Sequence, residues 1–331
     1  MTVPVGFAYQ RGEVARLMFV VDDRATALPV ALTAFAHSNR AKSALLQGQA
    51  VPLTIDGLLE DWELWQDTAM HMAECFRDDP SLVSHWVHLD SVVWDPPLVR
   101  NPLMLFAAAN YSAHTREAEK SDLVGQKVGT GDGDPYLFQK PLRSVVGSTD
   151  PVVKPFDVEQ MDWEVELALV IGRSGRRIPR CNAMSHVAGY MVCNDLSARD
   201  FVRRPDWPMF SSDWFAQKSF DTFTPVGPVL VPSAAIPDID SLRLRLWVGN
   251  QLMQDGHVGE MLFSIPEQIE FASRFVTLKP GDVISTGTPA GVGMATGRYL
   301  QAGETMTTEI TGLGRQITTV LDEVARDSSS S

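Results

Sequence analysis

Short hydrophobic stretches with a two-residue alternation dominate the chain after residue 100 and predict many short strands. Valine, isoleucine and leucine are frequent in these stretches, and glycine or proline separates one stretch from the next. Such punctuation is typical of strands joined by turns. The expected strands cover residues 103–110, 136–142, 163–172, 187–197, 226–232, 242–254, 282–288 and 305–320.

The first hundred residues have a different pattern. Residues 7–23 alternate like a hairpin, whereas residues 28–48 and 57–79 carry apolar positions at the helical spacings of three and four. The Pro-rich segment 94–102 follows and forms a natural boundary. We therefore expect a small α+β domain over residues 1–97, a catalytic domain over residues 98–325, and a disordered polar tail over residues 326–331.

One clear helix is predicted in the larger domain, within residues 264–282. Ser264 is suited to cap its N-terminus, and Pro266 is tolerated in a first turn. Its buried stripe is expected to comprise Ile265, Ile269, Phe271, Ala272 and Phe275. Because so few helices cannot supply βαβ crossovers, the expected fold is α+β and predominantly β, a sandwich or roll.

Composition narrows the class of protein. The 331 residues are 44% hydrophobic and 21% charged, and the net charge of −13 disfavours nucleic acid as a partner. No apolar run reaches the ~18 residues of a membrane span, and no cationic and apolar leader is visible at the N-terminus. Three scattered cysteines argue against a disulfide framework, so we expect a cytoplasmic protein with no membrane partner.

Two glutamates in the 163–172 stretch raise the first question of chemistry. Glu164 and Glu166 share one face of the expected strand because side chains alternate. On a solvated face they are ordinary, and the stretch alone favours that interpretation. If the face lines a cavity, the two carboxylates need a bound cation or a proton to offset their negative charge. Asp195 ends the 187–197 stretch, and three clustered carboxylates suit Mg²⁺ or Mn²⁺, although an Asp there is also a common cap.

Other residues could complete an active site. His114 and Glu117 stand three apart, so one helical turn would let the carboxylate orient an imidazole base, although such pairs are common on surface helices. Lys218 lies among aromatic residues, which favours partial burial over the usual exposure of lysine. Residues 280–293 contain TGTPAGVG, whose backbone N–H groups and Thr288 hydroxyl suit either an anion or a simple turn.

These segments occur in an order that resembles the fumarylacetoacetate hydrolase superfamily. The order is NYxxHxxE, FxKP, ExE, NDxSARD, QKSFDTFTPxGP and LKPGDVISTGTPAGVG, over about residues 100–320. The resemblance implies a β-rich roll or sandwich in homodimers, with a lid at residues 115–135. The Gly-rich part of that segment also predicts a mobile loop. A bound Mg²⁺ or Mn²⁺ is implied too, with Ca²⁺ as its substitute in a crystal.

The resemblance further implies a role for each motif residue. Glu164, Glu166 and Asp195 would hold the metal. His114 and Glu117 would activate water or move a proton, with Lys218 beside them. The implied substrate contacts are Arg199, Thr288, Tyr111, Lys140 and Gly287.

Two positions depart from the founding members of that family. Ala107 stands seven positions before His114, where those members carry a further metal carboxylate, and Val202 stands three positions after Arg199, where they carry a glutamine. The departures favour a smaller 2-oxo or 2,4-dioxo acid as substrate. We expect metal-dependent C–C hydrolysis of an acylpyruvate in aromatic or related catabolism. The alternatives are a 2-hydroxy-dienoate isomerase, an oxaloacetate decarboxylase, a 2-oxo acid hydratase and a non-catalytic metabolite-binding protein.

Overall fold

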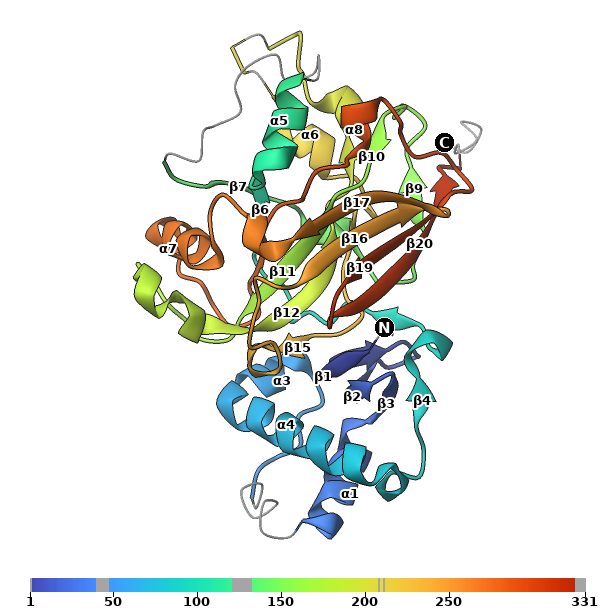
Figure 1. The fold of residues 1–331 in the computed structure, drawn as a ribbon, viewed down its shortest axis with the longest axis vertical. Coiled ribbons are helices and arrows are strands. Elements are labelled where there is room, and N and C mark those ends of the chain that lie inside the picture. The colour runs from blue at the N-terminus through green and yellow to red at the C-terminus, as the bar shows by residue number, and fades with distance from the viewer. Residues whose placement is uncertain (1, 40–47, 121–132, 208, 211, 325–331) are drawn as a thin grey trace, which may run out of the picture.

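The computed structural model describes residues 2–39, 48–120, 133–207, 209, 210 and 212–324 (Figure 1). The tail predicted over residues 326–331 lies outside these ranges, as do residues 121–132 of the predicted lid. Within them, no helix is both long enough and apolar enough to cross a membrane.

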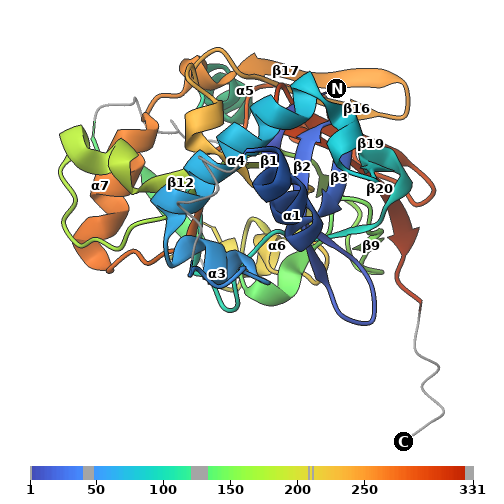
Figure 2. The ribbon, with the colours of Figure 1, turned by 90° about the horizontal axis from the view of Figure 1, so that it is seen from below.

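The N-terminal region is a five-stranded sheet with helices on one side. The predicted hairpin is confirmed as the antiparallel pair β1 and β2. Residues 57–79 form parts of two helices, α3 and α4, because Asp61 leaves the helical conformation (φ −138°, ψ 64°). The sheet order is β4 (Val87–His88), β3 (Arg24–Ala27), β2 (Arg16–Asp22), β1 (Val3–Gln10), β5 (Trp94–Asp95). The helices, in front in Figure 2, are α1 (Leu28–Ser38), α3 (Ile55–Leu59) and α4 (Trp62–Asp78).

Two further sheets pack face to face in the rest of the molecule. The six-stranded sheet has the order β15 (Val231–Pro232), β12 (Val187–Asn194), β11 (Val165–Ile171), β18 (Val283–Ser285), β6 (Met104–Ala108), β7 (Tyr136–Gln139). The five-stranded sheet has the order β17 (Gln251–His257), β16 (Arg243–Val248), β19 (Thr305–Ile310), β20 (Gly314–Asp322), β9 (Val152–Lys154). Leu167, Leu246 and Met306 belong to the buried core that the two sheets share. The α+β, predominantly β prediction is confirmed.

The strand predicted over residues 226–232 is shorter than expected. Only Val231–Pro232 joins the sheet. Pro228 has no N–H to donate, and Gly227 has a positive φ of 94°, which a regular strand does not accommodate.

The six-stranded sheet has a second face, which meets the N-terminal region. Ala168 and Val170 of β11 belong to the same buried cluster as Phe7 of β1 and Phe19 of β2. Phe7 also exchanges two backbone hydrogen bonds with Leu230, with N···O distances of 3.0 and 2.8 Å. The hydrophobic core therefore continues across residue 97, where we placed the domain boundary from the sequence.

The predicted helix of the larger domain is α7 (Ile265–Phe275), on one flank of the sandwich (Figure 1). Its expected cap is confirmed as a capping box between Ser264 and Glu267. Phe275 was wrongly assigned to the buried stripe: it is 64% exposed. Gln268 and Ser273 are buried instead, because they lie on the same side of the helix as Ile269 and Ala272.

Three short helices gather at the end of the molecule opposite α1 and α4 (Figure 1). They are α5 (Ser112–Lys120), α6 (Trp214–Lys218) and α8 (Gly293–Thr296). α5 contains His114 and Glu117, α6 ends at Lys218, and α8 begins at the end of the segment 280–293. This end of the six-stranded sheet carries the candidate site.

Candidate metal centre and active site

Glu164, Glu166 and Asp195 lie together in the interior. One carboxylate oxygen from each lies within 4.8 Å of the others, and the three residues are 5%, 1% and 1% exposed. The solvated face that the stretch alone favoured is therefore wrong. The cluster forms because β11 and β12 are antiparallel neighbours: Glu166 pairs with Cys193, and the Asp195 N–H donates to the Glu164 carbonyl oxygen at 2.9 Å.

Three cations bind the carboxylates. Lys218 Nζ donates to Glu164 Oε2 at 2.7 Å and to Asp195 Oδ2 at 2.5 Å. Lys140 Nζ donates to Asp195 Oδ1 at 2.6 Å, and Arg199 Nη2 donates to Glu164 Oε1. Lys140 and Arg199, which the resemblance placed at the substrate, thus hold two of the carboxylates. Their contact with a substrate stays a prediction.

Glu166 is held differently from its neighbours. It accepts hydrogen bonds from Ser285 Oγ at 2.6 Å and from the Gly287 N–H at 3.0 Å. Burial, together with the charges of Asp195 and Glu164, raises its pKa well above the usual range. For Glu164, burial acts in the same direction, but the charges of Lys218 and Arg199 outweigh it and lower the pKa.

The charges of the cluster fit a hard divalent cation. Four buried carboxylates belong to it, Asp162, Glu164, Glu166 and Asp195, against the three cations Lys140, Lys218 and Arg199. Counting only these seven described residues, one negative charge is uncompensated unless Glu166 keeps a proton. A divalent cation would replace that proton, and ligands that are all carboxylate oxygens suit Mg²⁺ or Mn²⁺.

His114 and Glu117 lie on one side of α5, as their spacing predicts. His114 is 7% exposed, and its Nδ1 lies 4.0 Å from Glu117 Oε2, too far for a hydrogen bond. Within the described part of the chain, Nδ1 has no hydrogen-bond partner. The Glu117 carboxylate instead accepts the Gly291 N–H, at 2.9 and 3.2 Å from its two oxygens.

The remaining predicted contacts are also buried. Tyr111 is 1% exposed, and no described residue forms a hydrogen bond with its hydroxyl. Burial and the charge of Glu166 raise its pKa, so the hydroxyl keeps its proton. Thr288 Oγ1 donates to the Val165 carbonyl oxygen and accepts from Gln254 Nε2, both at 2.8 Å. In this structure Thr288 therefore supports β11, and its contact with a substrate carboxylate stays a prediction.

Gly287 is a glycine for a steric reason. Its φ is +92°, and a Cβ would lie 2.8 Å from the Cβ of Asn110. The close approach lets its N–H reach Glu166. Any contact with a substrate stays a prediction.

Asp162 and Ser285 belong to the site but are not among the residues predicted from the sequence. Asp162 accepts Arg199 Nε at 2.9 Å, and Ser285 donates to Glu166. Asp162 is two positions before Glu164, so continuing the same alternation would have found it. Ser285 carries no such signal, because its place beside Glu166 comes from the pairing of β18 with β11.

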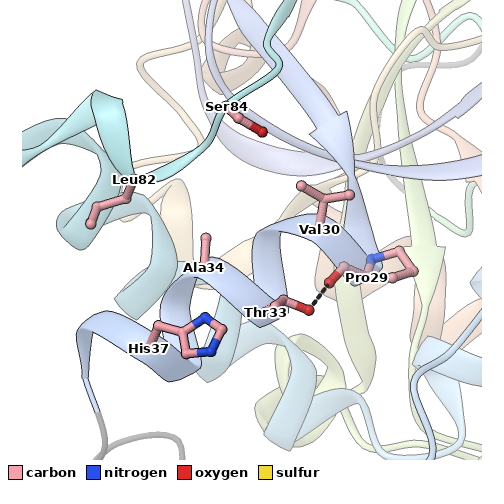
Figure 3. A pocket seen from close by; sticks show the side chains of 7 residues that line it. All are labelled: Pro29, Val30, Thr33, Ala34, His37, Leu82 and Ser84. Carbon is pink, nitrogen blue, oxygen red and sulfur yellow. Dashed lines mark hydrogen bonds between the residues drawn. The ribbon is translucent and has the colours of Figure 1, made fainter.

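A hollow between α1 and the short turn at Pro80–Leu82 is unrelated to this cluster (Figure 3). Its lining includes His37 and Thr33, whose hydroxyl donates to the Pro29 carbonyl oxygen at 2.8 Å. The described lining contains no carboxylate that could hold a metal.

Several known proteins are similar to this chain in sequence or in fold. The chain is 42% identical over 183 residues to the mitochondrial oxaloacetate tautomerase Fahd2 of Xenopus laevis, an alignment that spans 55% of this chain and 56% of the relative. The structure resembles a probable 2-hydroxyhepta-2,4-diene-1,7-dioate isomerase from Mycobacterium abscessus, with TM-score 0.69 and 26% identity over 97% of this chain and all of that one. It also resembles a maleylpyruvate hydrolase from Sphingobium sp. SYK-6, with TM-score 0.67 and 25% identity over 96% of this chain and all of that one.

A match to a family model, which covers most of the sandwich, identifies the family. The family model described as fumarylacetoacetate (FAA) hydrolase C-terminal matches residues 104–321, which run from β6 to β20 and include the whole acid cluster. This chain belongs to the fumarylacetoacetate hydrolase family.

Proposed function

We propose that this protein is a metal-dependent tautomerase or isomerase, which moves a proton between the enol oxygen and a carbon of a small 2-oxo acid such as oxaloacetate. The observation that carries the proposal is the buried His114, which lies close enough to Glu164 to influence its pKa and whose Nδ1 has no partner among the described residues. A proton shuttle needs one such basic nitrogen. The similarity to an oxaloacetate tautomerase supports this choice over the hydrolase that we expected from the sequence.

The residues that would hold the metal are Glu164, Glu166 and Asp195. When bound, the cation would stabilise negative charge on the 2-oxo and carboxylate oxygens of the substrate. The remaining chemistry belongs to the chain: His114 takes the proton from one substrate atom and returns it to another. Tyr111, protonated because its pKa is raised by burial and by Glu166, can donate a hydrogen bond to a substrate oxygen.

Hydrolysis of an acylpyruvate is the second candidate. It needs His114 to deprotonate a water, and Glu117 to orient the imidazole. The 4.0 Å between Nδ1 and Oε2 exceeds hydrogen-bond distance by about 1 Å, so a small movement of α5 would join the two. The similarity to a maleylpyruvate hydrolase supports this candidate.

Turnover separates these reactions. The purified full chain would be given Mn²⁺ and, in turn, oxaloacetate, acetylpyruvate, fumarylpyruvate and a 2-hydroxy-dienedioate, with enol absorbance and pyruvate both recorded. We expect the protein to accelerate enol loss or double-bond migration over the uncatalysed rate without releasing pyruvate. A metal chelator should abolish this acceleration. His114→Ala should lower the rate by about 10²–10⁴-fold, the usual contribution of a general acid or base.

Other outcomes would replace the proposal. Pyruvate from a dioxo acid would establish the hydrolase, and pyruvate from oxaloacetate alone would establish the decarboxylase. No turnover of any substrate, with metal bound, would favour the metabolite-binding protein.

We also propose that the protein is cytoplasmic and homodimeric. The location is inferred from the composition of the sequence, and the homodimer is inferred from the family resemblance. Sedimentation of the purified chain would test the dimer, and fractionation of the source cells would test the location.

A further inference from the structure

Asp162 is a buried carboxylate whose hydrogen-bond partners are all donors. It is 0% exposed. Oδ1 accepts the N–H groups of Trp163 at 2.8 Å and Gly293 at 2.5 Å, and Oδ2 accepts Arg199 Nε at 2.9 Å and the Met294 N–H at 3.1 Å. Such a carboxylate is saturated by the protein and has little capacity left for a metal or a substrate.

Arg199 joins this carboxylate to the predicted metal ligand Glu164. Its Nε donates to Asp162, and its Nη2 donates to Glu164 Oε1. A guanidinium group is planar, so fixing one edge on Asp162 fixes the direction in which the other edge meets Glu164. Lys218 holds Glu164 Oε2 from the other side.

The same carboxylate is tied to residues 291–294, which lead into the first turn of α8 and contact Glu117; we call this segment the 291–294 loop. Gly293 and Met294 donate to Asp162, and Gly291, two residues earlier, donates to Glu117. The segment packs closely against β17, because a Cβ on Gly291 would lie 1.9 Å from the Met253 carbonyl oxygen. A continuous hydrogen-bonded path therefore runs from Glu117 through this loop, Asp162 and Arg199 to Glu164.

We infer that Asp162 is a positioning residue: through Arg199 it sets the orientation of Glu164 for the metal, and through the 291–294 loop it sets the place of Glu117 relative to that metal. The inference rests on the proposed metal-dependent function. Groups that orient metal ligands in this way typically contribute about 10–100-fold to metal affinity. A residue that only anchored the loop would contribute to stability and leave metal affinity unchanged.

The test is a Mn²⁺ titration of the full chain without substrate, with free Mn²⁺ followed by electron paramagnetic resonance. In Asp162→Asn the side-chain NH₂ must face a donor, either Arg199 or the loop, so the link breaks while the size is kept. We expect the dissociation constant for Mn²⁺ to rise about 10–100-fold. Wild-type affinity in folded Asp162→Asn would overturn the inference.

Asp282→Asn is the matched control. Asp282 is 8% exposed and accepts the N–H groups of Leu103 at 2.9 Å and Lys279 at 2.7 Å, so it too is a buried carboxylate that anchors backbone. It lies beside Ile171, at the end of β11 farthest from Glu164. We expect lower stability and unchanged Mn²⁺ affinity. An equal loss of affinity in both variants would also overturn the inference.

Arg199→Lys tests the connection between Asp162 and Glu164 by changing Arg199, the residue that joins them. It replaces the Asp162→Asn test if that variant does not fold. It keeps the positive charge near Glu164 but removes the fork, and we expect a similar loss of Mn²⁺ affinity. The double variant should bind Mn²⁺ no more weakly than the single variant with the lower affinity, because the two residues act through each other. Additive losses, or wild-type affinity in Arg199→Lys, would overturn the inference. Wild-type protein that bound no Mn²⁺ would instead overturn the proposed function.

Discussion

At the scale of the residue, Glu166 is the member of the cluster that most depends on a counter-charge. Its neighbours Glu164 and Asp195 each bind a lysine, whereas Glu166 accepts only from Ser285 and Gly287 among the described residues. Burial and the two neighbouring charges raise its pKa. Without metal, burial and these charges therefore favour the neutral form of this carboxyl.

Replacement of Glu166 by glutamine should separate folding from metal binding. The neutral amide resembles the protonated carboxyl in size and charge, so we expect the metal-free Glu166→Gln variant to unfold at nearly the wild-type urea concentration. Loss of a direct charged ligand should weaken Mn²⁺ binding by more than the ~100-fold typical of outer-shell changes. Unfolding curves and a Mn²⁺ titration measure the two effects, and wild-type Mn²⁺ affinity would contradict the assignment of Glu166 as a ligand.

The raised pKa also predicts how metal binding depends on pH. Between the usual carboxyl value of ~4.3 and the raised value, the metal-free protein carries a proton on Glu166, which a cation must displace. Affinity for Mn²⁺ should rise with pH across this window, with one proton released per ion. Calorimetry in buffers of different ionisation enthalpy counts that proton, and no release within the window would contradict the prediction.

The raised pKa of Glu166 also predicts how the stability of the metal-free chain changes with pH. A carboxyl whose pKa is raised by folding stabilises the folded state at low pH, and that contribution is lost as pH rises toward the raised value. We expect this loss to be smaller in Glu166→Gln, which cannot ionise there. Urea unfolding at several pH values checks it, and equal pH dependence in both proteins would contradict it.

At the scale of the element, α7 shows how far a local pattern determines structure. Ser264 caps this helix, as the sequence predicts, and the structure adds the bond from its N–H to Glu267 Oε2 at 2.8 Å. Which side of the helix is buried was predicted less well, because the four- and three-residue spacing of Ile265, Ile269 and Ala272 also admits Gln268 and Ser273. Gln268 is accepted in the interior because its Nε2 donates to the Phe263 carbonyl oxygen at 2.9 Å.

Removal of the cap should cost stability and leave the site intact. We expect Ser264→Ala to lower the free energy of unfolding by about 1 kcal/mol, the usual value of such a cap. Urea unfolding measures the loss. Because Ser264 forms no bond to the acid cluster, Mn²⁺ affinity should stay at the wild-type value, and a loss of affinity would contradict this separation.

At the scale of the whole molecule, the N-terminal region and the sandwich both contribute residues to the two buried hydrophobic clusters. Val170 and Ala168 continue the face of β11 that begins with Glu164 and Glu166, and they pack with Phe7 and other N-terminal residues. The same strand face thus carries the acid cluster at one end and the contact with the N-terminal sheet at the other. The N-terminal sheet therefore supports the strand that carries Glu166 and that begins directly after Glu164.

Phe7→Ala tests this shared core. Phe7 is 0% exposed and contacts Phe19 and Trp62 edge-on, with centroids 6.5 and 6.0 Å away. We expect a loss of about 3–5 kcal/mol, as for other buried aromatic truncations, in a single unfolding transition that includes the sandwich. Urea unfolding followed both by tryptophan fluorescence and by Mn²⁺ release measures it, and two separate transitions would show independent domains.

The sequence by itself determined the local features of this protein. Alternation identified the main strands of the sandwich and placed Glu164 and Glu166 on one face, and the order of the motifs identified the family. The capping residue of α7 and the pairing of His114 with Glu117 on one helical side also follow from spacing alone. These features depend on residues a few positions apart, so a single segment contains the information.

Only the tertiary structure decided what surrounds those residues. The face of β11 is buried because other parts of the chain cover it, and no local pattern records that. Lys140, Lys218 and Arg199 meet the carboxylates from three separate segments, and the Gly291 N–H reaches Glu117 across 174 positions. Such contacts depend on how β11, β12, α5 and the 291–294 loop pack together. That packing, and not the residue types alone, creates the uncompensated charge that a metal ion would neutralise.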